Sequence, residues 1–483
     1  MGCLKRHSIG LQLLRMRLRA ALLAASLLVV APAVGARANE RVHEATGWLQ
    51  AYLRYDTSNP PGGEGPAAAY LASLLHRHGV STRRLISPTG RTSLYARVES
   101  PAPTAGALVL LHHIDVVPPG EGWTFPAFDG EIVDGKIRGR GAIDAKSLGI
   151  AHLQAFLEAA SQRDRLHRDV VYLAVADEEA GGLEGVGWLL EEHGELFDDA
   201  AAVLNEGGSN RVVAGRLLWW GIEVVQKRPL WLRLEATGRG GHASGFHPGS
   251  PTHLMVEALS RVLAIEHGER VGDAALLFFG AIAPFHRDSF QAVFQQPTAE
   301  AATGALAQSR AARTSPLLPG MDVYLRDTIQ VTSFKSGGES INVVAPSAVA
   351  TLDARLLPDT DEQAFLGRVR AAVGPGISVE VVLRAPMQTA SPVDHDDYRV
   401  IQRLLEPTAP VVPAFILGTT DSRYFRERGV RAYGFWPFVL DGDDNRGIHG
   451  KDEAIPVDKF LAGVELMRRA VRELAYRAEE PAR

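Results

Sequence analysis

The sequence predicts an α/β fold: an open mixed sheet with helices on both faces, interrupted by a smaller inserted α+β domain. Apolar runs rich in Val, Leu and Ala alternate with amphipathic stretches, and several runs end on acidic or imidazole residues. Buried strands of α/β sheets have this character, and their carboxyl ends form the edge that carries the site. A pattern of half-buried strands follows Gly221, and the α/β pattern returns after residue 389.

The first 38 residues differ from the rest of the chain. They contain six basic residues and no acidic one, and the largely apolar run 20–34 ends just before Ala36-Arg37-Ala38. This order is typical of a secretory signal peptide with cleavage near Ala38, so we expect a periplasmic or secreted protein. An uncleaved membrane anchor is the alternative, although the apolar run is short for a membrane span.

Cysteine content and charge exclude several classes of protein. Cys3 is the single cysteine and lies within the signal segment, so the mature chain would have neither a disulfide nor a thiol nucleophile. Loss of the segment removes six positive charges and lowers the formal net charge from −5 to −11. An acidic chain without a basic cluster argues against nucleic acid as a partner. We expect a small-molecule substrate instead.

The elements of the predicted catalytic domain follow in order, in a first part (39–221) and a second part (390–483). In the first part we expect helices at 39–55, 66–79, 146–160 and 185–192 and strands at 92–98, 107–115, 169–176 and 201–204. In the second part we expect helices at 396–406, 421–428 and 457–477 and strands at 411–417 and 430–436.

The inserted domain (222–389) is expected to be a lid or dimerisation domain with its own sheet. Its predicted strands are 227–237, 329–332, 341–344, 348–356 and 377–383, and its predicted helices are 252–266 and 361–373. Residues 268–325 are rich in Ala, Pro and Gly and weakly periodic, which indicates an insertion that is helical in part.

Side chains that bind metals gather where the predicted strands end. Two imidazoles and three carboxylates occupy these positions: His113, Asp144, Glu179, Glu206 and His449. Such a set fits a pair of zinc ions with one carboxylate bridging them. Glu178 is left beside Glu179 and is a natural general base. Taken alone, Glu178-Glu179 is equally typical of a solvated strand end, and His113-x-Asp115 is more typical of a strand edge with a solvated His.

Ordered motifs across nearly all of the mature chain carry a resemblance to a known family. They are HHIDVVP, EGWTFPAF, DGKIRGRGAIDAK, ADEEAGG, LNEGG, GRGGHAS, INVVAP with LDARLLP, GTTDSRY and GIHGKDE. In this order they resemble the co-catalytic dizinc aminoacylase/carboxypeptidase family, which includes acetylornithine deacetylase, succinyl-diaminopimelate desuccinylase and glutamate carboxypeptidase. The carboxypeptidase S and secreted N-acyl-amino-acid hydrolase branch is the most similar in appearance.

The resemblance implies a role for each metal ligand. His113 and Glu206 would bind one zinc ion, Glu179 and His449 the other, and Asp144 would bridge the two. Two Zn²⁺ per chain are implied, with Co²⁺ as a substitute.

The resemblance also implies the catalytic and substrate-binding residues. Asp115 would orient His113, and Glu178 would carry a proton from a metal-bridging water to the leaving nitrogen. His242 would stabilise the oxyanion, often across the interface of a homodimer. Three further residues would hold the substrate and its carboxylate: Asn342, Arg355 and Arg423. For Arg355 a purely structural ion pair with Asp353 or Asp361 is the alternative.

The implied function is hydrolysis of an amide or peptide bond next to a free carboxylate. Carboxypeptidases and N-acyl-amino-acid amidohydrolases use the same residues, so the sequence leaves the substrate open between them. A non-catalytic binding relative of the same fold is the alternative from another class. Relatives without activity normally lose a ligand or the base, whereas every one of these positions is filled here.

Overall fold

The structure is a computed structural model that describes residues 44–337, 340–385 and 389–477. The predicted signal segment, residues 1–38, lies outside these described residues. Within them, no helix combines the length and the apolar character that crossing a membrane requires.

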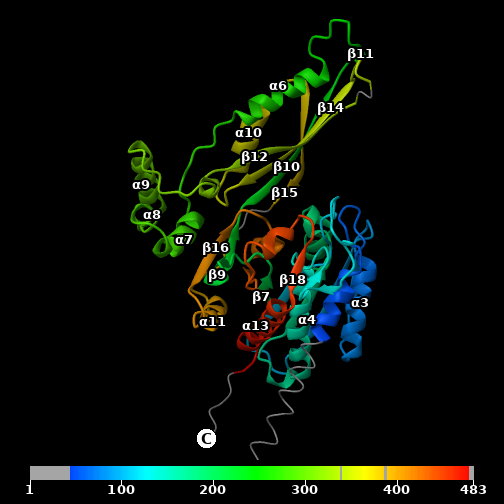
Figure 1. Ribbon diagram of the computed structural model, residues 1–483, viewed down its shortest axis with the longest axis vertical. Coiled ribbons are helices and arrows are strands. Elements are labelled where there is room, and N and C mark those ends of the chain that lie inside the picture. The colour runs from blue at the N-terminus through cyan, green and yellow to red at the C-terminus, as the bar shows by residue number, and fades with distance from the viewer. Residues whose placement is uncertain (1–43, 338–339, 386–388, 478–483) are drawn as a thin grey trace, which may run out of the picture.

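The larger of two main sheets is mixed and, within the described residues, has nine strands (Figure 1). Its central strands β6, β3 and β7 run parallel to one another, with β17 parallel to β7. From one edge to the other the order is β1 (Arg83–Ile86), β2 (Thr92–Val98), β6 (Val170–Val175), β3 (Ala107–His113), β7 (Ala200–Asn205), β17 (Arg431–Gly434), β9 (Arg216–Gln226) and β16 (Val411–Ile416), and β8 (Arg211–Val213) pairs with β9.

Every residue of β3 is buried, because helices cover both faces of the sheet. Leu108 and Leu110 belong to one apolar cluster, and Val109 and Leu111 belong to another. The first cluster includes α3 (Glu64–Arg77), α4 (Lys146–Ser161), α11 (Asp396–Leu405) and α13 (Val457–Ala475), and the second includes α5 (Trp188–Glu192) and α12 (Ser422–Glu427). The α/β sheet with helices on both faces is thereby confirmed.

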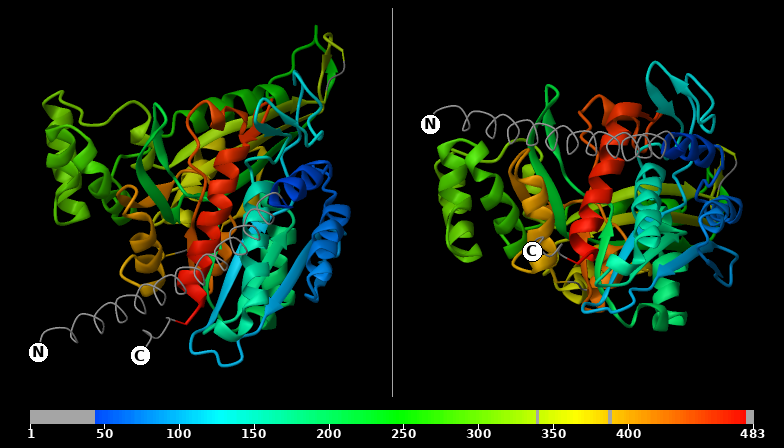
Figure 2. Two further views of the ribbon diagram at one scale, coloured as in Figure 1. Left: turned by 60° about the horizontal axis from the view of Figure 1, so that its bottom comes forward. Right: turned by 90° about the horizontal axis from the view of Figure 1, so that it is seen from below.

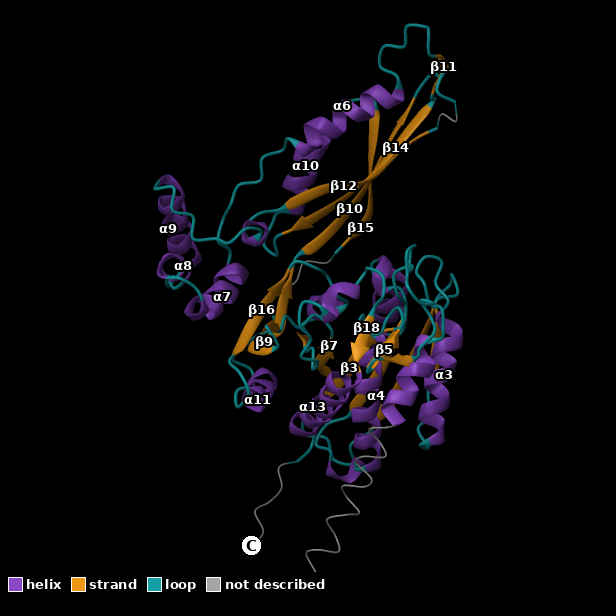
Figure 3. Cartoon of the chain, viewed as in Figure 1, coloured by secondary structure: helices purple, strands orange, loops and turns teal. Residues whose placement is uncertain are grey.

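The smaller sheet is antiparallel and lies above the larger one in Figure 1. Its order is β12 (Thr328–Ser336), β14 (Ser347–Leu356), β10 (Arg228–Thr237) and β15 (Ile377–Arg384). Buried and half-buried residues alternate along β14, as expected for a sheet packed on one face. Figure 3 shows the packed face covered by α6 (Pro251–Leu263) and α10 (Glu362–Val373). This is the α+β unit that the alternating strand patterns predict.

The chain passes from one sheet to the other at Lys227, which separates β9 from β10. This change comes later than the predicted boundary after Gly221, because 222–226 complete a strand of the larger sheet. Lys227 is buried, its backbone N–H donates to Ile416 (3.0 Å), and its Nζ donates to the carbonyl of Arg326 (2.7 Å).

The weakly periodic segment 268–325 is helical in part, as predicted. Its helices are α7 (Asp273–Ile282), α8 (Asp288–Phe294) and α9 (Ala299–Ala311). They share the main apolar cluster of the larger sheet, and α7 contacts β16. Figure 2 shows these green helices on the side of the molecule away from the blue N-terminal helices. The predicted domain boundaries themselves stay a prediction.

Two short sheets bring distant loops together. One joins β4 (Ile132–Val133), β5 (Lys136–Arg138) and β18 (Ala454–Pro456), so the loop after β5 lies beside the loop before β18. The other pairs β11 (Gly241–His242) with β13 (Val343–Val344) beyond the end of the smaller sheet.

Candidate metal centre

The side chains of the centre come from loops at one edge of the larger sheet. His113 is the last residue of β3, Glu179 lies in a short helical turn after β6, and Glu206 follows β7. Because these strands are parallel, their carboxyl ends meet at the same edge. Asp144 lies in the turn before α4, and His449 lies in the loop before β18. The structure therefore brings all five predicted metal ligands together.

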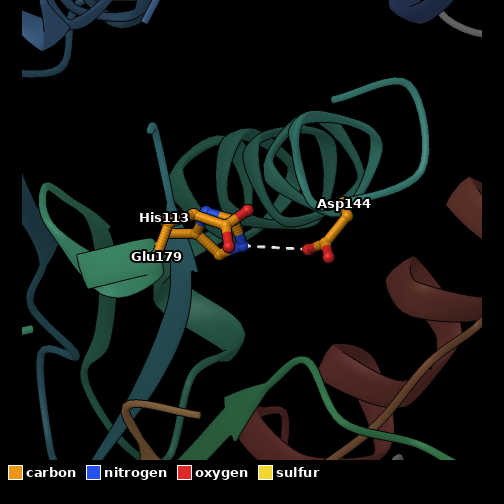
Figure 4. A group of neighbouring side chains, drawn as sticks. All are labelled: His113, Asp144 and Glu179. Atoms are coloured by element: carbon orange, nitrogen blue, oxygen red, sulfur yellow. Dashed lines mark hydrogen bonds and ion pairs between the residues drawn. The ribbon is translucent and has the colours of Figure 1, made fainter. Parts of the chain in front are cut away.

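Asp144 lies between two imidazoles. Its Oδ1 is 3.1 Å from Nε2 of His113, and its Oδ2 is 3.2 Å from Nε2 of His449 (Figure 4 shows the first contact). A second carboxylate accompanies each imidazole: Glu206 Oε2 is 3.7 Å from His113 Nε2, and Glu179 Oε2 is 3.3 Å from His449 Nε2. The structure thus pairs His113 with Glu206 and His449 with Glu179, as in the two predicted ligand sets, and Asp144 contacts both imidazoles.

The electrostatics of the centre favour additional positive charge. Hydrogen bonds to Asp144 and Glu179 raise the pKa of His449 to about 10. Burial raises the pKa of Glu206 to about 7, although the nearby His113 opposes this shift. Closely spaced carboxylates and imidazoles of this kind are usually stabilised by binding a metal ion.

The donor set fits zinc. The ligand atoms of His113, Asp144 and Glu179 lie within 4.8 Å of one another, and so do those of His113, Glu178 and Glu206. Imidazole nitrogens and carboxylate oxygens are common zinc ligands in hydrolytic sites. The second group includes Glu178, so proximity alone does not separate a ligand from a base among the two adjacent glutamates.

Asp115 supports the centre in a different way from the one predicted. Nδ1 of His113 lies 2.8 Å from the backbone carbonyl of Asp115 and 3.8 Å from its carboxylate. The carboxylate instead accepts the backbone N–H groups of Glu178 (3.2 Å) and Glu179 (3.1 Å) and the side-chain amide of Asn59 (2.8 Å). Asp115 therefore orients His113 through its main chain and holds the two glutamates through its side chain.

Sequence reasoning missed an ionic network beneath this turn. Arg91 pairs with Glu64, and its Nη1 donates to Asp177 at 2.7 Å. Asn59 bridges the carboxylates of Asp115 and Asp177. Asp177 has a positive φ of 73° and directs the chain into the two glutamates. No sequence motif marks Arg91, because its partners come from separate segments.

Sequence reasoning also gave no role to Glu453, although this residue lies in the motif GIHGKDE. Its fully buried carboxylate accepts the backbone N–H groups of Gly141 (3.0 Å), Ile143 (2.7 Å) and Asp144 (3.0 Å). It also pairs with Nη1 of Arg140 at 2.7 Å. Glu453 thereby fixes the turn that presents Asp144 to both imidazoles.

We expect Glu453→Gln to lower the free energy of unfolding by about 3 kcal/mol, because it leaves Arg140 buried without its counter-charge. Urea denaturation of the metal-free protein measures this loss. Asp452→Asn is the matched control, since among the described residues the half-buried Asp452 bonds only Thr124 of a loop, and Asn tolerates its positive φ. Equal effects of the two changes would contradict the role given to Glu453.

A cavity of about 320 Å³, here called the arginine cavity, opens beside the centre. Glu178, Glu179 and His449 line it together with Arg355 of β14. Arg355 is the single Lys or Arg among the described residues of the lining. Its Nε and Nη2 each donate to Asp353 at 2.8 Å. The ion pair with Asp353 is therefore present and holds Arg355 at the cavity wall.

Arg423 occupies a different place from the predicted one. Its side chain is fully buried and is not part of the cavity lining. The guanidinium donates to Thr419 Oγ1 (2.8 Å) and to the carbonyls of Thr420 (2.7 Å) and Gly181 (2.6 Å). A side chain without exposed surface does not reach a substrate, so we correct its interpretation: Arg423 supports the loop whose threonines line the cavity.

The structure does not bring His242 and Asn342 to the centre of the same chain. Both are exposed and lie beside each other beyond the far end of the smaller sheet, near β11 in Figure 1. The backbone N–H of Ala243 donates to the carbonyl of Asn342 at 2.8 Å, and Nδ1 of His242 lies 2.7 Å from Ser244 Oγ. Neither residue lines the arginine cavity.

Comparisons with known proteins agree with this architecture. Aminoacylase-1B of Rattus norvegicus is 26% identical over 448 residues, which cover 90% of this chain and 96% of the relative. N-fatty-acyl-amino acid synthase/hydrolase of Xenopus tropicalis is 30% identical over 367 residues, covering 72% and 68%. The crystal structure of an M20 family metallo-carboxypeptidase from Sulfolobus solfataricus superimposes with a TM-score of 0.67 at 18% identity, covering 89% of this chain and 98% of that one.

A family model fits the part of the chain that carries every predicted metal ligand, the smaller sheet and most strands of the larger sheet. The model of peptidase family M20/M25/M40 matches residues 109–473. The chain therefore belongs to peptidase family M20/M25/M40 and is a metal-dependent amide or peptide hydrolase.

Proposed function

We propose that the protein is an exported dizinc hydrolase that cleaves an amide or peptide bond next to a free carboxylate. The observation that carries this proposal is the position of Asp144, whose two carboxylate oxygens each face a different imidazole. One carboxylate shared by two His–carboxylate pairs is the arrangement that two adjacent metal ions need. The names of the aminoacylase and metallo-carboxypeptidase relatives support the choice of bond.

The chain supplies one ligand set for each ion. His113 and Glu206 would hold the first zinc, His449 and Glu179 the second, and Asp144 would contact both. When bound, two zinc ions would polarise the amide carbonyl and lower the pKa of water.

Glu178 is the residue assigned to proton transfer. It lines the arginine cavity next to the ligands, and Asp115 holds its backbone N–H. We assign it the proton of the attacking water, which it passes to the leaving nitrogen as the carbon–nitrogen bond breaks. Arg355, which lines the same cavity, would receive the carboxylate of the substrate on its Nη1–Nη2 edge, since Nε and one N–H of Nη2 already bond Asp353.

Metal analysis combined with two substrates tests the proposal. The chain without residues 1–38, loaded with zinc and desalted, is expected to retain about two zinc ions and to hydrolyse an N-acetyl amino acid or a dipeptide. Less than one zinc per chain, together with no turnover of either substrate, would contradict the proposed function.

We expect Arg355→Lys to lower kcat/KM for a free-acid substrate by the equivalent of about 2–5 kcal/mol, because Lys does not reproduce the guanidinium fork. The carboxamide of the same substrate should show little further loss. Arg423→Lys is the matched control: it should lower stability and leave the acid-to-amide ratio of kcat/KM unchanged. Kinetics on the acid and its amide measure both ratios. A changed ratio in Arg423→Lys alone would restore the role predicted from sequence.

The proposal includes export and a homodimer. Export rests on the order of basic residues, apolar run and Ala36-Arg37-Ala38. Mass spectrometry of the native protein would identify a new N-terminus near residue 39, and an intact N-terminus in the cytoplasmic fraction would contradict export.

The homodimer rests on the exposed position of His242 and Asn342, which leaves both free to reach the centre of a partner subunit.

A further inference from the structure

A second cavity, of about 360 Å³, also borders the metal ligands. It shares Asp144, Glu206 and Gly207 with the arginine cavity, so the two spaces adjoin at the centre and a single substrate can extend into both. Five apolar side chains line it: Ile143, Trp436, Phe438, Leu440 and Ile448. We call this space the apolar cavity.

The wall formed by 436–440 is held firmly in place. Nδ2 of Asn210 donates to the carbonyls of Trp436 (2.8 Å) and Phe438 (3.2 Å), and Oδ1 of Asn210 accepts the N–H of Gly221 (3.2 Å). The rings of Trp436 and Phe438 pack edge to face with centroids 5.0 Å apart. A Cβ on Gly208 would lie 2.6 Å from the backbone N of Trp436, so only glycine permits this approach. The cavity is therefore preformed, as ligand pockets usually are.

The charges of the lining disfavour substrates with a free amine. Among the described lining residues the only charged groups are Asp144 and Glu206, and both are assigned to the metal ions. The side-chain amide of Asn210 already bonds backbone groups. Ser209 and Asn445, both neutral, are therefore the polar side chains left to contact a substrate. A free α-ammonium in this space would lose water without gaining a counter-charge, which is costly, whereas an apolar acyl chain would gain from burial.

We propose that the apolar cavity binds the acyl chain of an N-acyl amino acid, so that the enzyme prefers such substrates to dipeptides with a free amine. This inference rests on the proposed function and on Arg355 as the cation that selects which end enters the arginine cavity. In the reaction, water adds its oxygen to the acyl carbon and the carbon–nitrogen bond breaks. The proton of water goes to nitrogen, and the products are a fatty or short-chain carboxylic acid and a free amino acid.

The first test varies only the acyl group. The zinc-loaded enzyme is given N-acetyl-, N-butanoyl- and N-hexanoylalanine, and kcat/KM is expected to rise at least about 10-fold over the series. The dipeptide 2-aminobutanoylalanine differs from N-butanoylalanine only by its free amine and should be at least about 10-fold poorer. A flat or falling series, or a preferred dipeptide, would overturn the inference and leave the proposed function standing. If no compound is hydrolysed, the proposed function fails and the inference fails with it.

The second test changes the cavity. Asn445→Asp adds a carboxylate at an exposed lining position and should shift the dipeptide-to-acyl ratio of kcat/KM toward the dipeptide by about 10-fold, whereas the neutral control Asn445→Ser should not. Leu440→Trp reduces the space and should abolish the gain in kcat/KM from acetyl to hexanoyl. Ile416→Trp, in the arginine cavity, should lower all acyl substrates alike. An acyl-length shift in Ile416→Trp and none in Leu440→Trp would reverse the assignment of the two cavities.

Discussion

Glu178→Gln is expected to lower kcat by about 10²–10⁴-fold while the protein still binds two zinc ions. The substitution keeps the shape of the side chain and removes its ability to accept a proton. Glu178 has no ion pair with His449, unlike Glu179, whose Oε2 lies 3.3 Å from that imidazole. We therefore expect KM to change little, and single-turnover kinetics with metal analysis of the same sample to measure both quantities.

Glu179→Gln is the matched comparison, since it makes the same chemical change one residue further along. It should lose the zinc held by His449 first, and added zinc should restore part of its activity. Both residues have the same side chain and both backbone N–H groups bond Asp115, so the chemical change and the main-chain support are the same for the two. If Glu178→Gln empties a metal site and Glu179→Gln does not, the two assignments are interchanged.

His242→Ala is expected to lower kcat by about 10²–10³-fold with zinc content unchanged, because it removes a proposed donor to the oxyanion. In the described chain His242 is exposed and its imidazole bonds only Ser244 of the same loop, so the donor would act on the centre of a partner subunit. Mixing inactive His242→Ala with inactive Glu178→Ala, followed by exchange of subunits, should then restore part of the activity. Hybrid dimers hold one site with both residues intact.

His253→Ala is the control, because His253 is exposed on α6 of the same unit and lies outside the loop of His242. It should retain full activity. A monomer by light scattering, with no recovery after mixing, would defeat the cross-subunit assignment while leaving the metal centre as assigned.

Much of the fold follows from the sequence because its buried strands are short apolar runs bounded by polar residues. β3 and β6 are predicted within two residues for this reason. β9 was missed as a strand of the larger sheet because the sequence changes character at Gly221, within this strand, so that 222–226 were grouped with β10. Periodicity describes one segment at a time and does not indicate that the chain has entered another sheet.

The candidate site was predictable to the extent that each residue follows a strand at one shared edge. His113, Glu179 and Glu206 meet this condition. The side chain of Arg423 is fully buried, and a sequence motif does not reveal how deeply a side chain is buried. Residues that support the metal ligands were harder to predict from the sequence. Glu453 acts on a turn more than 300 positions earlier, and only tertiary structure reveals that relation.

The single-residue junction at Lys227 has a mechanical consequence. In the register of β10 with β14, Arg355 pairs with Pro229, next to the junction, whereas His242 lies beyond the other end of the ten-residue β10. At about 3.3 Å per residue, some 30 Å of strand separates the two positions. A rotation of the smaller sheet by about 10° around Lys227 would move the far end by roughly 5 Å and Arg355 by far less. Arg355 thus lies close to the axis of such a rotation, whereas His242 lies far from it and would be displaced the most.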